Sequence, residues 1–165
     1  MSKIKNIPNS GDDVADVCRA QSEHRGVWMG FIYDELKKGG HDAEGILRRA
    51  IRRAGITQGE SHKKLCADPG NCNDFGKVFQ RGGMVQRIFN AKNISHDNDN
   101  FKIEFQYCGL VTAWQKMGFD DETCALLCDI AMEIDRGTAD GMGLKLSMDE
   151  TIGKGGSACK VHFHT

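Results

Sequence analysis

The chain has 165 residues, of which 39% are hydrophobic and 27% are charged. This length is ordinary for one domain and short for two, and the composition can form a core without driving the chain to disorder. The formal net charge of −1 gives no global field that would attract nucleic acid or an anionic membrane surface. No apolar run approaches the length of a membrane span, and residues 1–16 lack the apolar stretch of a signal peptide. We therefore expect a cytoplasmic protein that binds neither nucleic acid nor membrane.

Seven cysteines are many for a chain of this size. Their number is odd, no export signal is evident, and the chain can build a core without disulfide bonds, so we expect reduced thiols. The open question is whether they fill the core, bind a metal or act as nucleophiles. They are Cys18, Cys66, Cys72, Cys108, Cys124, Cys128 and Cys159.

The N-terminal third predicts two helices after a loose lead-in at residues 1–11. The first helix should begin at Asp12 or Asp13, where a carboxylate can cap it, and run to about Lys38. Residues 42–54 predict the second helix, with a glycine as its stop at Gly55. The apolar residues of the first helix follow spacings of three and four, which predicts a stripe that faces the core. This stripe comprises Val14, Val17, Cys18, Trp28, Phe31, Ile32 and Leu36.

The middle of the chain predicts a short helical turn and then two strands. The turn covers residues 75–79, the first strand residues 84–92, and a polar hairpin-type loop residues 93–100. The second strand, residues 101–107, is the clearest, because apolar and polar side chains alternate and give one dry face and one wet face. The dry face holds Phe101, Ile103, Phe105 and Tyr107.

The C-terminal third predicts two helices and two strands. The helices are residues 110–117 and 122–135, and a segment of small residues follows at 137–143. The strands are residues 144–148 and 158–164. The order of elements predicts an α+β fold in one domain over residues 1–165, with about four antiparallel strands covered on one face by helices.

Cys108 has the best position for a nucleophile. It follows the clearest strand and stands just before a helix that starts at Gly109. Unpaired N–H groups and the positive end of a helix lower a thiol pKa and favour the thiolate. A buried cysteine at the end of a strand is an equally good interpretation of the same pattern.

Cys128 and Asp135 lie two helical turns apart, so both should point to one side of the late helix. Small residues beside an acid leave room for a ligand. The simpler interpretation is that cysteine fills the core as a small hydrophobic residue.

His24 falls within the apolar stripe of the first helix. A buried imidazole needs a partner, so this histidine is either a satisfied core residue or part of a site. Cys159 faces the core on the last strand, while His162 and His164 share the opposite face. Because such an exposed pair seldom binds metal and no cysteine pairs complete a zinc ribbon, we expect neither a metal nor a cofactor.

Three segments of the C-terminal half carry a family resemblance. They read Tyr-Cys-Gly-Leu-Val-Thr-Ala-Trp from Tyr107, Leu-Leu-Cys-Asp-Ile-Ala-Met-Glu-Ile-Asp-Arg-Gly from Leu126, and Thr-Ile-Gly-Lys-Gly-Gly-Ser-Ala-Cys-Lys-Val-His-Phe from Thr151. The chain resembles the L-2-amino-thiazoline-4-carboxylic acid hydrolase family, strongly over about the last 60 residues and more loosely before them. Where the family pattern has an acidic residue after the late glycine, this chain has Gly155-Gly156-Ser157, which leaves the exact substrate open.

The resemblance implies a hydrolase that opens a small five-membered ring at an amidine-like carbon. A thiolate or an activated water would attack that carbon, and a carboxylate or an imidazole would move the protons. The implied catalytic residues are Cys108, Cys128, Asp135 and His24. The implied substrate-binding residues are Cys159, Gly109, whose N–H could steady developing charge, and Trp114.

Two other interpretations use the same residues. One is a non-catalytic module that binds a small molecule or senses redox state through its thiols. The other is a metal-binding domain that combines cysteines with His162 or His164. For partners, we expect a small-molecule substrate, and the sequence is compatible with a homo-oligomer.

Overall fold

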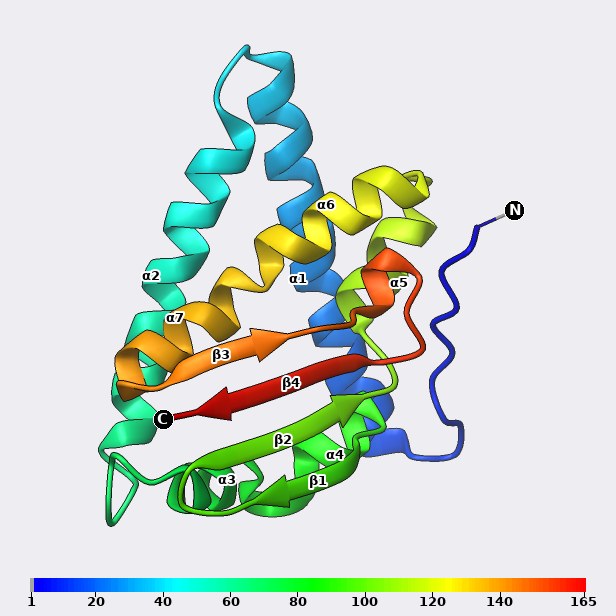
Figure 1. Ribbon diagram of the computed structural model, residues 1–165. Coiled ribbons are helices and arrows are strands. Elements are labelled where there is room, and N and C mark those ends of the chain that lie inside the picture. The colour runs from blue at the N-terminus through cyan, green and yellow to red at the C-terminus, as the bar shows by residue number, and fades with distance from the viewer. Residues whose placement is uncertain (1) are drawn as a thin grey trace.

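The computed structural model describes residues 2–165, which form seven α-helices, two 3₁₀ turns and four strands (Figure 1). The helices are α1 (Asp13–Lys38), α2 (Ala43–Lys63), α3 (Cys72–Phe79), α4 (Met84–Phe89), α5 (Gly109–Lys116), α6 (Asp121–Ala131) and α7 (Glu133–Met142). The 3₁₀ turns are η1 (Arg81–Gly83) and η2 (Ile152–Lys154), and the strands are β1 (Lys92–His96), β2 (Asn100–Phe105), β3 (Lys145–Met148) and β4 (Cys159–His164).

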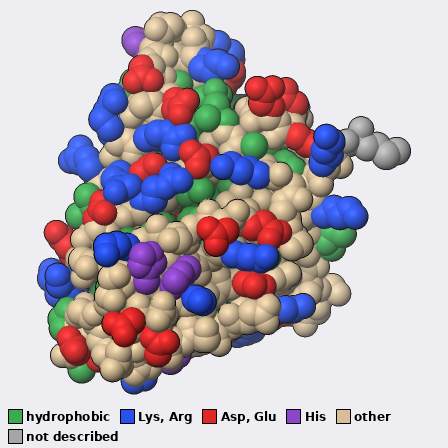
Figure 2. All heavy atoms as spheres, in the orientation of Figure 1, with side chains coloured by type: hydrophobic (Ala, Val, Ile, Leu, Met, Phe, Trp, Pro, Cys, Tyr) green, Lys and Arg blue, Asp and Glu red, His purple; other side chains and the backbone are tan. Residues whose placement is uncertain are grey.

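The four strands form one antiparallel sheet in the order β1-β2-β4-β3. In its centre Phe101 pairs with Phe163 and Ile103 with Val161, and all four side chains are buried. The helices lie behind this face, and Figure 2 shows that the opposite face carries charged and histidine side chains. The predicted α+β fold, with an antiparallel sheet covered on one face by helices, is therefore confirmed.

The core consists of two apolar clusters. One joins α1, α5 and α6 to η2 and is centred on Trp114, Leu127 and Ile152, which are fully buried. The other lies between α3 and the sheet, where Phe75 contacts Phe101 and Phe163 edge-to-face with ring centroids 5.6 and 5.0 Å apart. Six of the seven cysteines divide between these clusters, Cys18 being the exception, and none of the seven is in a disulfide bond.

The second helix does not stop at Gly55, as the sequence led us to expect, but continues to Lys63. Gly55 and Gly59 of α2 face Gly137 and Gly141 of α7 at backbone contact. A Cβ atom at Gly55 would lie 2.3 Å from the Ile134 carbonyl oxygen, so only glycine permits this approach. We call these four glycines the glycine seam. The predicted segment of small residues at 137–143 is mostly helical, because its glycines belong to α7 and pack against α2.

The strand predicted at residues 84–92 is wrong, because most of this segment forms helix α4. Gly82 and Gly83 both have positive φ and turn the chain into the helix, and Asn90 ends it in the left-handed region. The buried Arg19 guanidinium donates hydrogen bonds to the carbonyl oxygens of Ile88 and Arg87, which the helix end leaves free. The first strand, β1, begins at Lys92, the last residue of the predicted strand, and the rest of it lies in the expected loop.

The late helix predicted over residues 122–135 is two helices, α6 and α7, which meet at Met132. The apolar stripe of α1 is also placed differently from our expectation. Small residues form much of its buried face, together with Arg19, Met29 and Tyr33, and the apolar side chains of Val14, Val17, Trp28 and Phe31 are exposed. None of the helices within residues 2–165 combines the length and apolar character needed to cross a membrane.

Candidate functional site

Cys108 stands between β2 and α5 as the residue that caps the helix. Its backbone is fixed by Asn6, from the segment before α1: the Cys108 N–H donates to Asn6 Oδ1 at 2.8 Å, and Asn6 Nδ2 donates to the Cys108 carbonyl at 2.7 Å. Asn6 Nδ2 also lies 2.9 Å from Thr112 Oγ1 in the first turn of α5. The candidate nucleophile therefore has a fixed main chain although it lies in a connection.

Two further thiols lie next to Cys108. Cys159 is paired with Phe105 in the sheet, and its sulfur accepts a hydrogen bond from the Ile152 N–H at 3.4 Å. Cys128 of α6 packs directly on η2, because a Cβ atom at Gly153 would lie only 2.6 Å from the Cys128 sulfur. The Cys108 charge raises the pKa of both Cys128 and Cys159, after the larger effect of burial. The three sulfurs thus form one group.

Asp135, in the first turn of α7, completes this group, which we call the thiol–acid cluster: Cys108, Cys128, Cys159 and Asp135. Burial raises the pKa of Asp135 from 3.8 to about 6. Its charge in turn raises the pKa of Cys108 and of Cys159. Within residues 2–165 its carboxylate makes no hydrogen bond or ion pair with another side chain. An unpaired carboxylate with a pKa near neutrality suits general acid–base chemistry.

Burial opposes the thiolate that the sequence led us to expect at Cys108. Burial raises the pKa of Cys108, and the N–H groups of Val111 and Leu110 at the start of α5 offset this only in part. Burial likewise raises the pKa of Cys128 to about 12. The helix end does favour the thiolate, but loss of solvent is the larger effect. At neutral pH the base of the cluster is therefore Asp135.

Exposure within the cluster differs from one residue to the next. Cys128 and Cys159 are buried, with 6% and 9% of their surface exposed, whereas Cys108 and Asp135 are partly exposed. A small molecule would therefore first meet the thiol and the carboxylate that can exchange a proton. No group of three or more His, Cys, Asp or Glu side chains in residues 2–165 is arranged to hold a metal ion.

The other predicted site residues lie apart from this chemistry. Trp114 is fully buried, and its indole N–H donates to the Gly26 carbonyl at 2.9 Å, so it joins α5 to α1. Gly109 allows the same two helices to approach, since a Cβ atom there would lie 3.0 Å from Ser22 Cβ. His24 is exposed on the outer face of α1 and accepts a hydrogen bond from Trp28 Nε1 at 2.8 Å. The expectation that His24 lies in a buried stripe is wrong, because that stripe faces solvent.

Three residues near the cluster were not anticipated from the sequence. Asn6 lay in the predicted loose lead-in. Arg25 lies on α1, and its charge lowers the pKa of Cys108 at the start of α5. Thr151 is buried, favours the Cys128 thiolate, and has a hydroxyl with no full hydrogen bond in residues 2–165. Of these three residues, only Thr151 was marked in the sequence, because it is the first residue of the last segment that carries the family resemblance.

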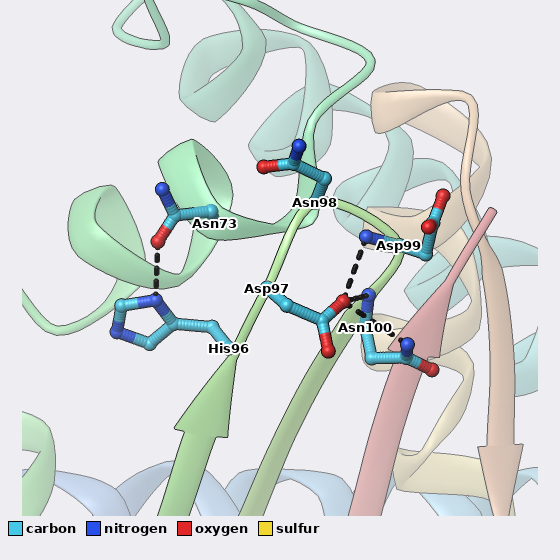
Figure 3. Close-up of a pocket in the computed structure, with 6 residues that line it drawn as sticks. All are labelled: Asn73, His96, Asp97, Asn98, Asp99 and Asn100. Carbon is cyan, nitrogen blue, oxygen red and sulfur yellow. Dashed lines mark hydrogen bonds between the residues drawn. The ribbon is translucent and has the colours of Figure 1, made fainter.

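Two hollows in the surface lie elsewhere. One, of about 560 Å³, surrounds the β1–β2 turn and is shown in Figure 3. There Asp97 Oδ1 accepts hydrogen bonds from the backbone N–H groups of Asp99 and Asn100, and His96 Nδ1 lies 2.7 Å from Asn73 Oδ1. The other, of about 510 Å³, is lined by Glu60, Lys63, Lys64, Pro69 and Gly141. The polar groups of the first hollow hold its own turn together, so we place the functional site at the thiol–acid cluster.

Comparison with known families decides the relationship of the chain. The model of the L-2-amino-thiazoline-4-carboxylic acid hydrolase family matches residues 19–163. The chain belongs to this family. The matched range contains the whole thiol–acid cluster, together with Arg25 and Thr151. Asn6 lies outside it.

Known structures and curated proteins add little to the functional assignment. The crystal structure of a trafficking protein particle complex subunit 3 from Naegleria fowleri, covalently bound to palmitic acid, is similar with a TM-score of 0.53. The two chains are 11% identical, over 88% of this chain and 95% of that one, which shows a common fold alone. No protein with a curated description matches the chain.

Proposed function

We propose that the chain is a hydrolase that opens a small cyclic amidine-like ring, such as that of L-2-amino-thiazoline-4-carboxylate, to a carbamoyl-cysteine product. The observation that carries this proposal is the Asp135 carboxylate, whose pKa burial raises to about 6 and whose charge acts on Cys108, a partly exposed thiol at the start of a helix. The name of the family supports a hydrolase in general. The substrate and the cysteine-lined site are our inference.

The cluster contains the groups that such a ring opening needs. Asp135 takes the proton of the Cys108 thiol, and the sulfur attacks the amidine-like carbon of the ring. The N–H groups of Leu110 and Val111 favour the thiolate as it forms. The carbon–sulfur bond of the ring then breaks, and Asp135 returns its proton to the departing sulfur.

Water completes the reaction by adding to the same carbon, which expels Cys108 as a thiolate. The thiolate regains a proton from the attacking water through Asp135. One water is consumed for each ring opened, and no other reactant is needed. The rival mechanism uses the water directly, with Asp135 as its base and the cysteines as lining. The raised pKa of all three thiols favours this rival, so the test must separate the two.

Two nearby side chains suit the substrate in charge and polarity. Arg25 lies close enough for its charge to act on Cys108, and it can pair with the carboxylate of the thiazoline. The unsatisfied Thr151 hydroxyl can bond to a ring heteroatom. We expect Arg25→Gln to raise KM more than it lowers kcat, and Arg25→Lys to restore part of the loss.

The decisive experiment is product analysis after incubation with the thiazoline under reducing conditions. We expect many turnovers to carbamoyl-cysteine. Asp135→Asn and Cys108→Ser should each lower the rate by at least about 100-fold, the loss typical of a catalytic group, and the sequence predicts a similar loss for Cys128→Ser. Cys124→Ser and Cys72→Ser are the matched controls, because both thiols are fully buried and neither belongs to the cluster.

Each outcome points to one mechanism. If Cys108→Ser and Cys128→Ser both stay folded with normal turnover while Asp135→Asn is inactive, water is the nucleophile. If substrate protects Cys108 from alkylation and Cys108→Ser is inactive, the thiol attacks. If the wild type releases no product from the thiazoline or from related cyclic amidines, the hydrolase proposal is wrong.

A second candidate is a non-catalytic module that binds a small molecule or senses redox state. Protonated thiols, two of them buried, favour this function, because they can hold a ligand without activating it. The module would bind the thiazoline in a one-to-one complex with no turnover. Measurement of the intact mass would reveal any covalent adduct on Cys108.

A further inference from the structure

The outer face of α1 presents its largest apolar side chains to solvent. Trp28 is 62% exposed, Phe31 57%, Ile32 49%, Val17 65% and Val14 53%. The buried face of the same helix is built largely from small residues. The helix is thus apolar on the side that has no partner within the chain.

The spacing of this face is that of a paired helix. Exposed side chains recur at intervals of alternately three and four residues along almost the whole of α1, which gives the seven-residue repeat of a two-helix seam. The seven positions are Val14, Val17, Gln21, His24, Trp28, Phe31 and Glu35, and every one is exposed.

We propose that this face of α1 pairs with α1 of a second copy of the chain, in antiparallel orientation around a two-fold axis near Ser22. In this register Val14 lies beside the partner's Phe31, and Val17 lies beside the partner's Trp28. Gln21 lies beside the partner's His24, so that two polar layers occupy the centre between two apolar ends. Each contact therefore joins a small side chain to a large one, or a polar one to a polar one.

Charge also favours the antiparallel orientation. The first turn of α1 contains Asp13 and Asp16, and the last turn contains Lys37 and Lys38. Lys38 is already paired with Asp34 and Glu35 of its own helix, so Lys37 is the charge that antiparallel pairing brings near the partner's acidic first turn. The antiparallel arrangement also opposes the dipoles of the two helices. Parallel pairing would instead place each of these groups beside its own copy.

The area suffices for a stable dimer. Aromatic side chains bury about 150–250 Å² each, so the five apolar side chains expose on the order of 500 Å² together. With the polar side chains of the same α1 face, the area that pairing would bury comes close to the ~800 Å² per partner of a standard interface. An apolar patch of this size is at the upper end of what a typical monomer exposes, about 300–600 Å².

Trp28 is held ready for such a contact. Its indole N–H donates to His24 Nε2 at 2.8 Å, and the two rings meet edge-on with centroids 5.2 Å apart. The indole can therefore lose its water on binding without leaving a donor unsatisfied. A fixed tryptophan near the centre of a patch is a typical anchor of a protein interface.

Sedimentation equilibrium of the full chain tests the interface. We expect the wild type to have twice the chain mass of 18.2 kDa at micromolar concentration. Trp28→Glu and Phe31→Glu should each weaken the dimer by at least about 30-fold, as loss of an interface anchor does. Leu65→Glu is the matched control, because Leu65 is 58% exposed but lies beyond the end of α2. It should leave the dimer intact.

A charge-pair experiment tests the orientation. Val17→Glu and Trp28→Lys should each be monomeric, but a mixture of the two should form a heterodimer, because only antiparallel pairing sets position 17 against position 28. Circular dichroism confirms that each variant is folded. A monomeric wild type, or a dimer that survives both Trp28→Glu and Phe31→Glu, overturns the interface. A dimeric wild type whose two variants stay monomeric when mixed overturns the antiparallel register.

Discussion

The glycine seam and the outer face of α1 are opposite solutions to helix packing. In the seam, α2 and α7 meet with almost no side chain between them, and a Cβ atom at Gly141 would lie 2.4 Å from the Ile56 carbonyl oxygen. On α1, large apolar side chains such as Trp28 and Phe31 stand in solvent. The two helices that approach most closely thus meet through glycines. The large apolar side chains on the outer face of α1 pack against no other helix of the chain within residues 2–165.

The difference teaches that apolar character and burial are separate properties of a helix face. Helices whose backbones touch gain dispersion and Cα–H···O contacts that need no apolar side chain. An apolar stripe indicates only that a helix face is buried from water. A second protein molecule can bury that face as well as the core can. Two of the five predictions below test this contrast directly, and all five run from the largest expected effect to the smallest.

Gly137→Ala should be as damaging as the loss of a large core side chain. Its Cβ atom would lie 2.3 Å from the Arg52 carbonyl oxygen and 2.9 Å from Gly55 Cα, and neither backbone atom can move without separating the helices. We expect the free energy of unfolding to fall by about 3 kcal/mol, measured by chemical denaturation. Gly70→Ala, whose nearest neighbour would be 3.9 Å away, is the control and should change it by less than about 0.5 kcal/mol. Equal effects at both positions would mean that the backbones of α2 and α7 are not in close contact at the glycine seam.

Neighbouring residues on α1 should respond very differently to alanine. Met29 is 9% exposed on the inner face, and Met29→Ala should lower the free energy of unfolding by about 2–5 kcal/mol. Trp28→Ala, measured at a dilution where the chain is monomeric, should lower it by less than about 0.5 kcal/mol. Both changes introduce alanine, the strongest helix former, so a loss of stability in either variant cannot come from helix propensity. A large loss in dilute Trp28→Ala would place the outer face in the core of the protomer.

Asp135→Asn should stabilise the protein while it removes activity. Burial raises the Asp135 pKa from 3.8 to about 6, so the folded chain prefers the protonated acid and loses stability as pH rises through about 6. The shift corresponds to about 3 kcal/mol at most, and partial exposure of the group reduces it to about 1–2 kcal/mol. The variant should therefore unfold at a higher temperature than the wild type at pH 8, with no difference at pH 3.

The pH dependence of wild-type activity should reflect the ionisation of Asp135. We expect kcat/KM to rise with pH through about 6 as Asp135 ionises, and the residual activity of Asp135→Asn to lack this limb. A wild-type profile that is flat from pH 5 to 8 would remove Asp135 from the role of base.

His24→Ala should have the smallest effect on turnover. His24 lies on the outer face, where it contacts Trp28 and no member of the thiol–acid cluster. We expect kcat/KM to stay within about 2-fold of the wild type, as for surface changes away from a site. A loss near that of Asp135→Asn would return His24 to the catalytic group.

The sheet was predictable from the sequence because its signals are local. Alternation at Phe101, Ile103 and Phe105 gave the central strand, and the order of elements gave four antiparallel strands. The spacing of Cys128 and Asp135 predicted that both lie on one side of a single late helix, whereas the break at Met132 places Cys128 on α6 and Asp135 on α7. The charge of Asp135 acts on Cys108 and Cys159, and the convergence of Asp135 with Cys128 stays a prediction, as does the role of each residue.

What the sequence could not predict depends on partners far along the chain. Gly55 ends a helix in most settings, and only the glycines of α7 explain why it continues one here. The thiolate expected at Cys108 follows from its helix end, whereas the raised pKa of this thiol follows from burial by other elements. His24 shares its stripe with apolar residues, and the sequence does not state which side of a helix meets the core.

The contact between Asn6 and Cys108 joins residues 102 positions apart, and it has a consequence for the order of folding. Contacts of such separation form late, because the loop between them must be ordered first. The start of α5 therefore acquires its final main-chain partners only after most of the sheet and helices are in place. We therefore expect Cys108 to be more open to alkylation and oxidation while the chain refolds than it is in the finished fold.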